Sequence, residues 1–174
     1  IQKNVTCINK GWIDIFAAIS PYNVKSSREA LSVATGIINM ICNDCLSLIK
    51  DNDAFVGIIG CIFEFVKQKV NINISLSSID LLWVMSNSPF MQHSVEMWTL
   101  VFDECTKLFF DERVVLANSA VTTLFNLLSS NTDKIPAEVF DKFLEVTFPD
   151  IIEQLVLNDS FVVVQQLLQE VSHY

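Results

Sequence analysis

The chain has 174 residues, 51% of them hydrophobic, and its formal net charge of −9 comes from 20 Asp and Glu against 11 Lys and Arg. Such an acidic chain lacks the cationic face that nucleic acids and anionic membrane surfaces require, which argues against direct binding to either. It contains only four Gly and four Pro, too few for the turns of a fold built from many short strands, so long helices are expected.

The cysteines and the hydropathy pattern indicate where the chain works. An odd number of cysteines within apolar stretches is typical of reduced thiols in a cytosolic protein. The longest run without a charged residue, 114–132, is interrupted by Asn, Ser and Thr, so we expect no transmembrane segment. Because no initiating Met is present, we expect a fragment of a larger protein, forming a single domain over residues 1–174. The five cysteines are Cys7, Cys42, Cys45, Cys61 and Cys105.

Two helices are predicted in the first 50 residues. The first carries apolar residues at helical spacing up to Ile19 and ends there, because Pro21 pushes the residue before it out of the α region. The second begins after a cap at Ser26 or Ser27 and reaches about Ile49. Its buried stripe is expected to contain Ala30, Ala34, Ile37, Ile41, Cys45 and Leu48.

The next helix is predicted to be the most buried one. Asp51 and Asp53 lie where its N-cap should be, and its apolar residues lie on more than one side. Gly57 and Gly60 would each destabilise it by about 1 kcal/mol relative to Ala, so the close approach of a neighbouring helix is expected at both. The residues expected in its core are Phe55, Ile58, Ile59, Ile62, Phe63 and Val66.

Three amphipathic helices follow. They cover about residues 75–87, 95–109 and 111–130; Pro89 ends the first, and Asp111 opens the third as its N-cap. The expected buried stripe of the third helix is Val114, Ala117, Val121, Leu124 and Leu128.

A further helix begins at Pro136. Proline suits the first turn of a helix, and Pro149 then kinks this helix or restarts it. The helical spacing places Val139, Phe143 and Val146 on its buried face.

A last helix is predicted after a cap at Asp159 or Ser160, and it ends with an apolar face still uncovered. Counting it, about eight helices with short loops form hairpins that recur roughly every 40 residues. The predicted fold class is therefore all-α, an armadillo/HEAT-like right-handed superhelix (solenoid) segment, with a closed helical bundle as the alternative. The apolar residues of the last helix are Phe161, Val164, Leu168 and Val171.

The residues give little indication of chemistry. Cys42 and Cys45 form the only CxxC pair, and a structural zinc site needs a second pair of ligands, which the distant His93 and His173 do not supply. Neither histidine lies in a pattern typical of a catalytic base. We therefore predict no enzyme, no catalytic residue, no cofactor and no metal, while an enzyme with a metal at the CxxC pair stays a rival hypothesis.

One polar line is a candidate for binding a protein partner. Asn118, Thr122 and Asn126 are spaced one helical turn apart beside the apolar stripe of helix 111–130. In a solenoid such a ridge can face the concave groove and form hydrogen bonds with a partner's backbone. Alternatively, it bonds a neighbouring hairpin or faces water.

Three strings along the first 130 residues carry a family resemblance. The first string resembles Gly-Trp-x-x-Ile-Phe and is Gly11-Trp12-Ile13-Asp14-Ile15-Phe16. The second resembles Ser-Leu-x-Ala-Ile-x-Leu-Leu-Trp and is Ser75-Leu76-Ser77-Ser78-Ile79-Asp80-Leu81-Leu82-Trp83. The third resembles Asp-x-Arg-x-x-x-Arg-Asn-Ser-Ala-x-x-Thr-Leu-Phe and consists of Asp111-x-Arg113, Asn118-Ser119-Ala120 and Thr123-Leu124-Phe125. These motifs mark the region downstream of the catalytic domain in the large Arf exchange factors and in their non-catalytic relatives, the Mon-two family of Golgi scaffolds. The Asn-Ser-Ala and Thr-Leu-Phe sequences of the third string are more similar to those of the Mon-two family than to those of the exchange factors.

The chain departs from the third motif at three positions. Ala117 replaces its second arginine, Val115 replaces an acidic residue, and Asn131 follows where His-Gly is usual. The departures fall before and after the Asn-Ser-Ala and Thr-Leu-Phe strings, which are both intact.

The resemblance implies a non-enzymatic scaffold that is peripheral on trans-Golgi network and endosome membranes and acts in vesicle-mediated protein transport. Its implied partners are Dopey-type proteins, Arf-like GTPases and a phospholipid flippase. Within such a scaffold, Trp12, Trp83 and Phe125 are interpreted as packing anchors between hairpins, or else as exposed contacts for a partner helix. The alternative functions are a karyopherin-like transport receptor and the regulatory region of a large Arf exchange factor.

Overall fold

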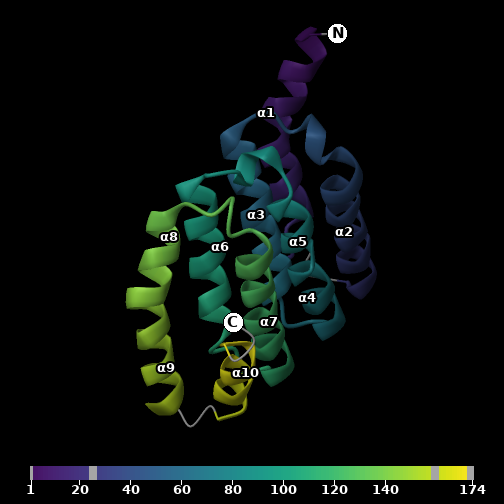
Figure 1. The fold of residues 1–174 in the computed structure, drawn as a ribbon. Coiled ribbons are helices and arrows are strands. Elements are labelled where there is room, and N and C mark those ends of the chain that lie inside the picture. Colours follow the sequence, from purple (N-terminus) through teal and green to yellow (C-terminus); the bar gives the residue numbers. More distant parts are fainter. Residues whose placement is uncertain (1, 24–26, 158–160, 172–174) are drawn as a thin grey trace. The chain divides into compact units, whose positions relative to one another are not determined.

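The computed structural model describes residues 2–23, 27–157 and 161–171, with side chains from residue 11 onward except that of Phe161. Within those ranges the chain is helical and contains no strand (Figure 1). It divides into two compact units, Ile1–Phe90 and Met91–Tyr174, and each is described here by itself. The expected single domain over residues 1–174 stays a prediction.

The first unit contains the predicted helices as five α-helices, two of which run on without a loop. Two irregular turns, η1 and η2, continue α2, and α5 follows α4 after Asp80, which keeps right-handed helical dihedrals. The elements are α1 (Gln2–Ile19), α2 (Arg28–Met40), η1 (Ile41–Cys45, a π-helix), η2 (Leu46–Leu48, a 3₁₀-helix), α3 (Asn52–Lys67), α4 (Ile72–Ile79), α5 (Leu81–Ser86) and the 3₁₀ turn η3 (Pro89–Met91).

The second unit has five further α-helices. Its longest rod is continuous from α8 through η4 to α9. With α2–η2, α4–α5 and α8–α9 each taken as one rod, the described ranges hold eight helices, the number predicted. The elements are α6 (Val95–Leu108), α7 (Val114–Ser130), α8 (Ala137–Lys142), η4 (Phe143–Thr147, a π-helix), α9 (Phe148–Leu157) and α10 (Phe161–Val171).

Helix α3 is the core of the first unit, as predicted. It lies against α1 on one side and α4 and α5 on the other (Figure 1). The close approach expected at its glycines occurs at only one of them. A Cβ at Gly57 would lie 3.3 Å from the Phe16 ring of α1, whereas a Cβ at Gly60 would meet nothing within 4 Å. The six residues predicted for its core are all buried, namely Phe55, Ile58, Ile59, Ile62, Phe63 and Val66.

The predicted stripe of α2 was wrong by a rotation about the helix axis. The predicted Ala34 and Ile41 are buried, but Ala30 and Leu48 are exposed, and Leu31 and Ile38 are buried in addition. Within the CxxC pair, Cys42 is buried, whereas Cys45, which was predicted on the buried stripe, is only partly buried. Both sides of this helix are apolar, so the pattern alone did not show which side α1 and α4 would cover.

One helical stretch, Arg28–Leu48, passes a test for membrane spans by its length and its mean hydropathy of 1.4. The stretch contains the charged residues Arg28, Glu29 and Asp44. Core helices pass the same test, so one such helix is weak evidence for a span. The absence of a transmembrane segment stays a prediction.

The helix starts follow the cap predictions in part. Ser27 caps α2, where its hydroxyl accepts from the Ala30 N–H at 3.1 Å; the alternative cap Ser26 lies outside the described residues, as do Asp159 and Ser160 before α10. Asp111 does not cap α7, so that prediction was wrong. The carboxylate of Asp111 instead accepts bidentately from the Arg113 guanidinium, at 2.7 and 2.8 Å, and from the Arg113 N–H.

The rod from α8 to α9 shows why one predicted face was wrong. Val139 and Phe143 are buried as predicted, but Val146 is 55% exposed. The π-turn η4 adds one residue to a helical turn, so the buried line continues at Ile151 and Leu155 instead. Pro149 lies in the first turn of α9, where proline is tolerated, and the rod runs through it without a break.

Candidate binding groove

The three residues of the predicted polar line, Asn118, Thr122 and Asn126, do not share one environment. The Thr122 hydroxyl donates to Glu170 Oε1 and accepts from Gln166 Nε2, both at 3.0 Å, so it joins α7 to α10. Asn126 is exposed, and Asn118 Oδ1 is buried without a hydrogen-bond partner among the described residues. A role of these three residues in partner binding stays a prediction, while Thr122 already has partners within the chain.

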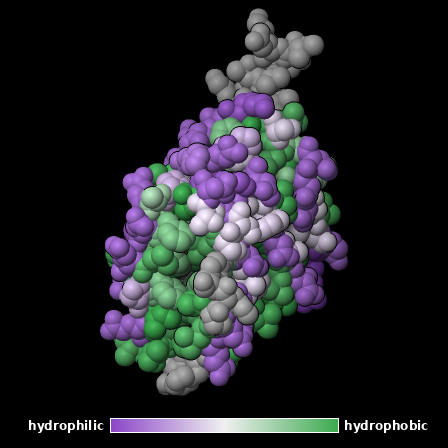
Figure 2. Space-filling model, viewed as in Figure 1, coloured by the Kyte–Doolittle hydropathy of each residue, from purple (hydrophilic) through white to green (hydrophobic). Residues whose placement is uncertain are grey.

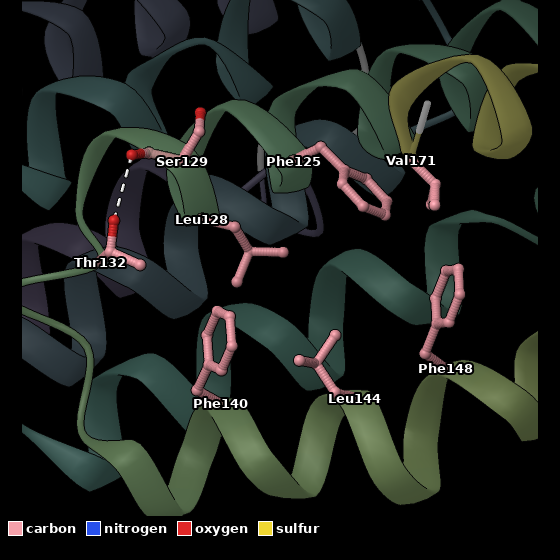
Figure 3. Close-up of a pocket in the computed structure, with 8 residues that line it drawn as sticks. All are labelled: Phe125, Leu128, Ser129, Thr132, Phe140, Leu144, Phe148 and Val171. Carbon is pink, nitrogen blue, oxygen red and sulfur yellow. Dashed lines mark hydrogen bonds between the residues drawn. The ribbon is translucent and has the colours of Figure 1, made fainter. Parts of the chain in front are cut away.

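A larger candidate lies in the second unit, between α7 and the rod of α8, η4 and α9. Figure 3 shows Phe140, Leu144 and Phe148 pointing from this rod toward α7, and Phe125 and Leu128 pointing back from α7. They enclose an apolar cavity of about 450 Å³ that is open to solvent. We call it the α7–α9 groove. Its lining is completed by Ser129, Thr132 and Val171.

The spacing of the lining residues explains the groove's shape. On α7 the lining positions 125, 128 and 129 form one helical face, which the turn residue at 132 extends, and on the opposite rod positions 140, 144 and 148 repeat every four residues. An edge-to-face contact of Phe125 with Phe148, at 6.1 Å between ring centroids, joins the two helices at one end. Two helices joined at one end leave a channel between them, and Leu144 in that channel is 45% exposed.

The solvent side of the α7–α9 groove is acidic. Asp141 and Glu145 each follow a lining residue, so they lie about a quarter turn farther round the helix, on the side away from the buried Phe143. Both are exposed, and neither forms an ion pair within the described residues. Lys142 lies a further quarter turn away, three residues before Glu145, and forms no ion pair within the described residues.

The acidity belongs to the whole second half of the chain. Residues 91–174 hold thirteen Asp and Glu against four Lys and Arg, whereas residues 1–90 hold seven of each. Two of the four cations are engaged locally, because Lys107 pairs with Glu104 at 2.6 Å and Arg113 with Asp111. Figure 2 shows the hydrophobic surface near α8 and α9 with hydrophilic residues along its outer border. The groove is thus an apolar channel in a strongly negative unit.

Three of the five cysteines are buried thiols with raised pKa values. Burial raises the pKa of the Cys42 thiol to about 12 and that of Cys61 to about 12, and it raises the pKa of Cys105 as well. Thiols with such raised pKa values are poor nucleophiles near neutral pH. Cys7 and His173 have side chains outside the described part of the chain.

Metal-binding geometry was also sought. No group of three or more His, Cys, Asp or Glu that could hold a metal occurs in the ranges that the structure describes. His93 is exposed in a turn with a positive φ of 56°, where its backbone N–H donates to the Lys134 carbonyl at 2.9 Å. An open cavity of about 460 Å³ borders the CxxC segment, but its lining mixes polar and apolar side chains and includes both Asp44 and Lys50.

The proposed packing anchors differ in burial. Trp12 is 6% exposed and stacks on Phe16 with a centroid distance of 5.8 Å, and Phe125 is also 6% exposed. Trp83 is 46% exposed, so its interpretation as a buried anchor was wrong. Its neighbours Leu82 and Met85 take the buried positions of α5.

The α7–α9 groove was not predicted from the sequence. The signal that could have revealed it is the spacing of Phe140, Leu144 and Phe148, because an apolar line beside the buried one marks a second face on the same helix. Comparison with known proteins adds no identity: no family model, no curated protein and no solved structure matches the chain.

Proposed function

We propose that this chain is a non-enzymatic scaffold segment that binds protein partners in membrane traffic between the trans-Golgi network and endosomes. The observation that carries the binding role is the open α7–α9 groove, an apolar channel on the surface of an otherwise well-packed helical unit. Contiguous exposed apolar surface of this kind is typical of interaction sites. The trafficking role rests on the resemblance to the Mon-two family.

The proposal includes the architecture and the setting. Successive helical hairpins belong to an armadillo/HEAT-like right-handed superhelix, in which neighbouring helices pack pairwise as α6 with α7 and α7 with α10 do. The protein is cytoplasmic and peripheral on trans-Golgi network and endosome membranes. Its partners are Dopey-type proteins, Arf-like GTPases and a phospholipid flippase, and it binds no nucleic acid.

Direct binding of purified partners tests this function. We expect the immobilised chain to retain a Dopey-type protein or an Arf-like GTPase, and to leave the rate of nucleotide release from an Arf-family GTPase unchanged. Accelerated nucleotide release would contradict the scaffold and favour an exchange-factor role. Failure to retain any of the three partner types would remove the trafficking proposal.

A karyopherin-like transport receptor is the second candidate. The excess of nine negative charges in residues 91–174 favours it, because import cargo is commonly recognised through basic segments. Retention of Ran or of a basic import cargo, in place of Golgi proteins, would decide for this candidate.

A further inference from the structure

We propose that the α7–α9 groove binds a basic amphipathic helix of a partner protein, with the partner's apolar stripe in the channel and its Lys or Arg against Asp141 and Glu145. The inference rests on the proposed scaffold function only in that the occupant is a protein. It adds the secondary structure and the charge of the segment that is bound.

The dimensions of the groove fit a helix of about two turns. Lining residues extend from Phe125 on α7 to Thr132 in the turn that follows it, and from Phe140 to Phe148 on the opposite rod. At 1.5 Å per residue these spans are about 10 and 12 Å. Two turns of a partner helix present three or four apolar side chains at positions i, i+3, i+4 and i+7, the mode of helix-in-groove recognition.

The surfaces that border the channel select the charge of the occupant. The rod contributes the exposed carboxylates Asp141 and Glu145, and the end of α7 with the turn after it contributes the uncharged Ser129 and Thr132. A cationic helix therefore meets opposite charge on one side and no repulsion on the other. The negative potential of the whole unit also increases its rate of encounter.

The same charges disfavour other occupants. A second copy of this chain would bring another unit with an excess of nine negative charges, and an anionic vesicle would be repelled in the same way. A small apolar ligand could enter the cavity, but it would leave the acidic rim without a role. Each of these occupants is separated from the basic helix by the experiment below.

The experiment uses the complete chain and three fluorescein-labelled 16-residue peptides. The probe peptide carries Leu at i, i+3, i+4 and i+7 with Lys on both flanks. One control has Glu at every Lys position, and the other has the probe's composition with its Leu residues scattered. Fluorescence anisotropy is expected to give a Kd of the order of 10 μM for the probe, with much weaker binding of both controls and of the probe at high salt.

Chain variants then place the peptide in the groove. Leu144→Ser is expected to weaken probe binding roughly tenfold, and Asp141→Lys with Glu145→Lys should also weaken it roughly tenfold. The matched control is Glu138→Lys with Glu153→Lys, which makes the same change in net charge at exposed positions of the same rod outside the lining. It should leave the Kd within about twofold. Circular dichroism and Tm verify that every variant is folded.

The proposal is overturned if the Lys and Glu peptides bind equally, if neither binds, or if the rim and control variants behave alike. It is also overturned if the peptide does not bind but the chain self-associates in sedimentation, binds anionic vesicles or takes up an apolar dye. In that case Leu144→Ser should abolish the binding that is observed, which would assign the groove to that other occupant. If every groove variant still retains Golgi partners, the scaffold function is supported but the groove is not its binding site. Peptide binding without any Golgi partner would leave the groove and remove the trafficking role.

Discussion

Residues 1–90 and 91–174 are nearly equal in length and both helical, but they differ in charge and in the enclosure of their helices. The first half has as many basic as acidic residues and encloses α3 between α1, α4 and α5. The second half has an excess of nine negative charges and leaves one side of the rod from α8 to α9 uncovered. Apolar residues exposed on its last three helices are Leu144, Val146, Val156, Leu157, Val162, Leu168 and Val171.

The difference teaches that similar composition can serve two purposes in one chain. In α3, apolar residues on several sides make a helix that neighbours surround and that contributes mainly to stability. In the rod from α8 to α9, a second apolar line beside the buried one exceeds what the core needs and remains open to solvent. Binding is therefore expected in the second half and resistance to unfolding in the first.

The largest effect is expected from a matched pair of Phe→Ala substitutions, one in each half. Phe55 in α3 is fully buried and stacks on Phe90 at 4.8 Å between centroids, so Phe55→Ala should lower the free energy of unfolding by about 4 kcal/mol. Phe140 lines the groove and is only partly buried, so Phe140→Ala should cost about 1 kcal/mol. Urea unfolding followed by circular dichroism measures both. Equal losses would remove the distinction between an enclosed and an open helix.

A second pair of substitutions, at two tryptophans, separates the effect of burial from that of the half of the chain in which a residue lies. Trp98 in α6 is fully buried in the acidic half, whereas Trp83 in α5 is 46% exposed in the neutral half. Trp98→Ala should lower the free energy of unfolding by about 3 kcal/mol, less than its size suggests, because its buried indole Nε1 has no hydrogen-bond partner among the described residues. Trp83→Ala should cost below about 1 kcal/mol. The reverse order of urea midpoints would contradict the burial seen here.

A third effect is the response of stability to alkaline pH. The folded protein raises the pKa of Cys42 and Cys61 to about 12 from 9.0, so it holds both thiol protons more tightly than the unfolded chain does. This stability is complete below about pH 9 and is lost as the pH rises toward 12, by about 1 kcal/mol per thiol between pH 8 and 10. Urea midpoints measured over this range should fall less in Cys61→Ala than in the partly buried control Cys45→Ala. If the urea midpoints of Cys61→Ala and Cys45→Ala fell equally with rising pH, the stabilising contribution of the Cys61 thiol proton would be refuted.

The smallest effect distinguishes the two glycines of α3. Gly60→Ala should raise the free energy of unfolding by up to about 1 kcal/mol, because the added Cβ meets nothing and Ala favours the helix. At Gly57 the Cβ would lie 3.3 Å from the Phe16 ring, so the gain should be smaller or reversed. Thermal unfolding of both variants measures the difference. A larger gain at Gly57 would show that α1 does not press on α3 as described.

Two predictions that depended on local chemistry were confirmed. Pro21 follows the end of α1 by two residues, and Ser27 caps α2, because a pyrrolidine ring and a hydroxyl act on the residues next to them. The fold class, all-α, followed from such local signals together with the scarcity of Gly and Pro.

Predictions that needed knowledge of neighbours did less well. Asp111 was expected to cap α7 but forms an ion pair with Arg113, because a carboxylate near a helix start has more than one partner within reach. Thr122 was proposed for an external partner but bonds α10, 44 and 48 residues farther along the chain. No local pattern shows which distant helix lies opposite.

By itself the sequence determined that the chain forms about eight amphipathic helices, where most of them begin and end, and that its second half is strongly acidic. These properties depend on residues close together in the chain or on composition alone. Only the tertiary structure decided which side of α2 is covered, where the π-turn η4 shifts the buried line, and that Phe140, Leu144 and Phe148 face Phe125 and Leu128 across an open channel. Packing between distant helices decides these features, because a helix with two apolar sides can bury either one.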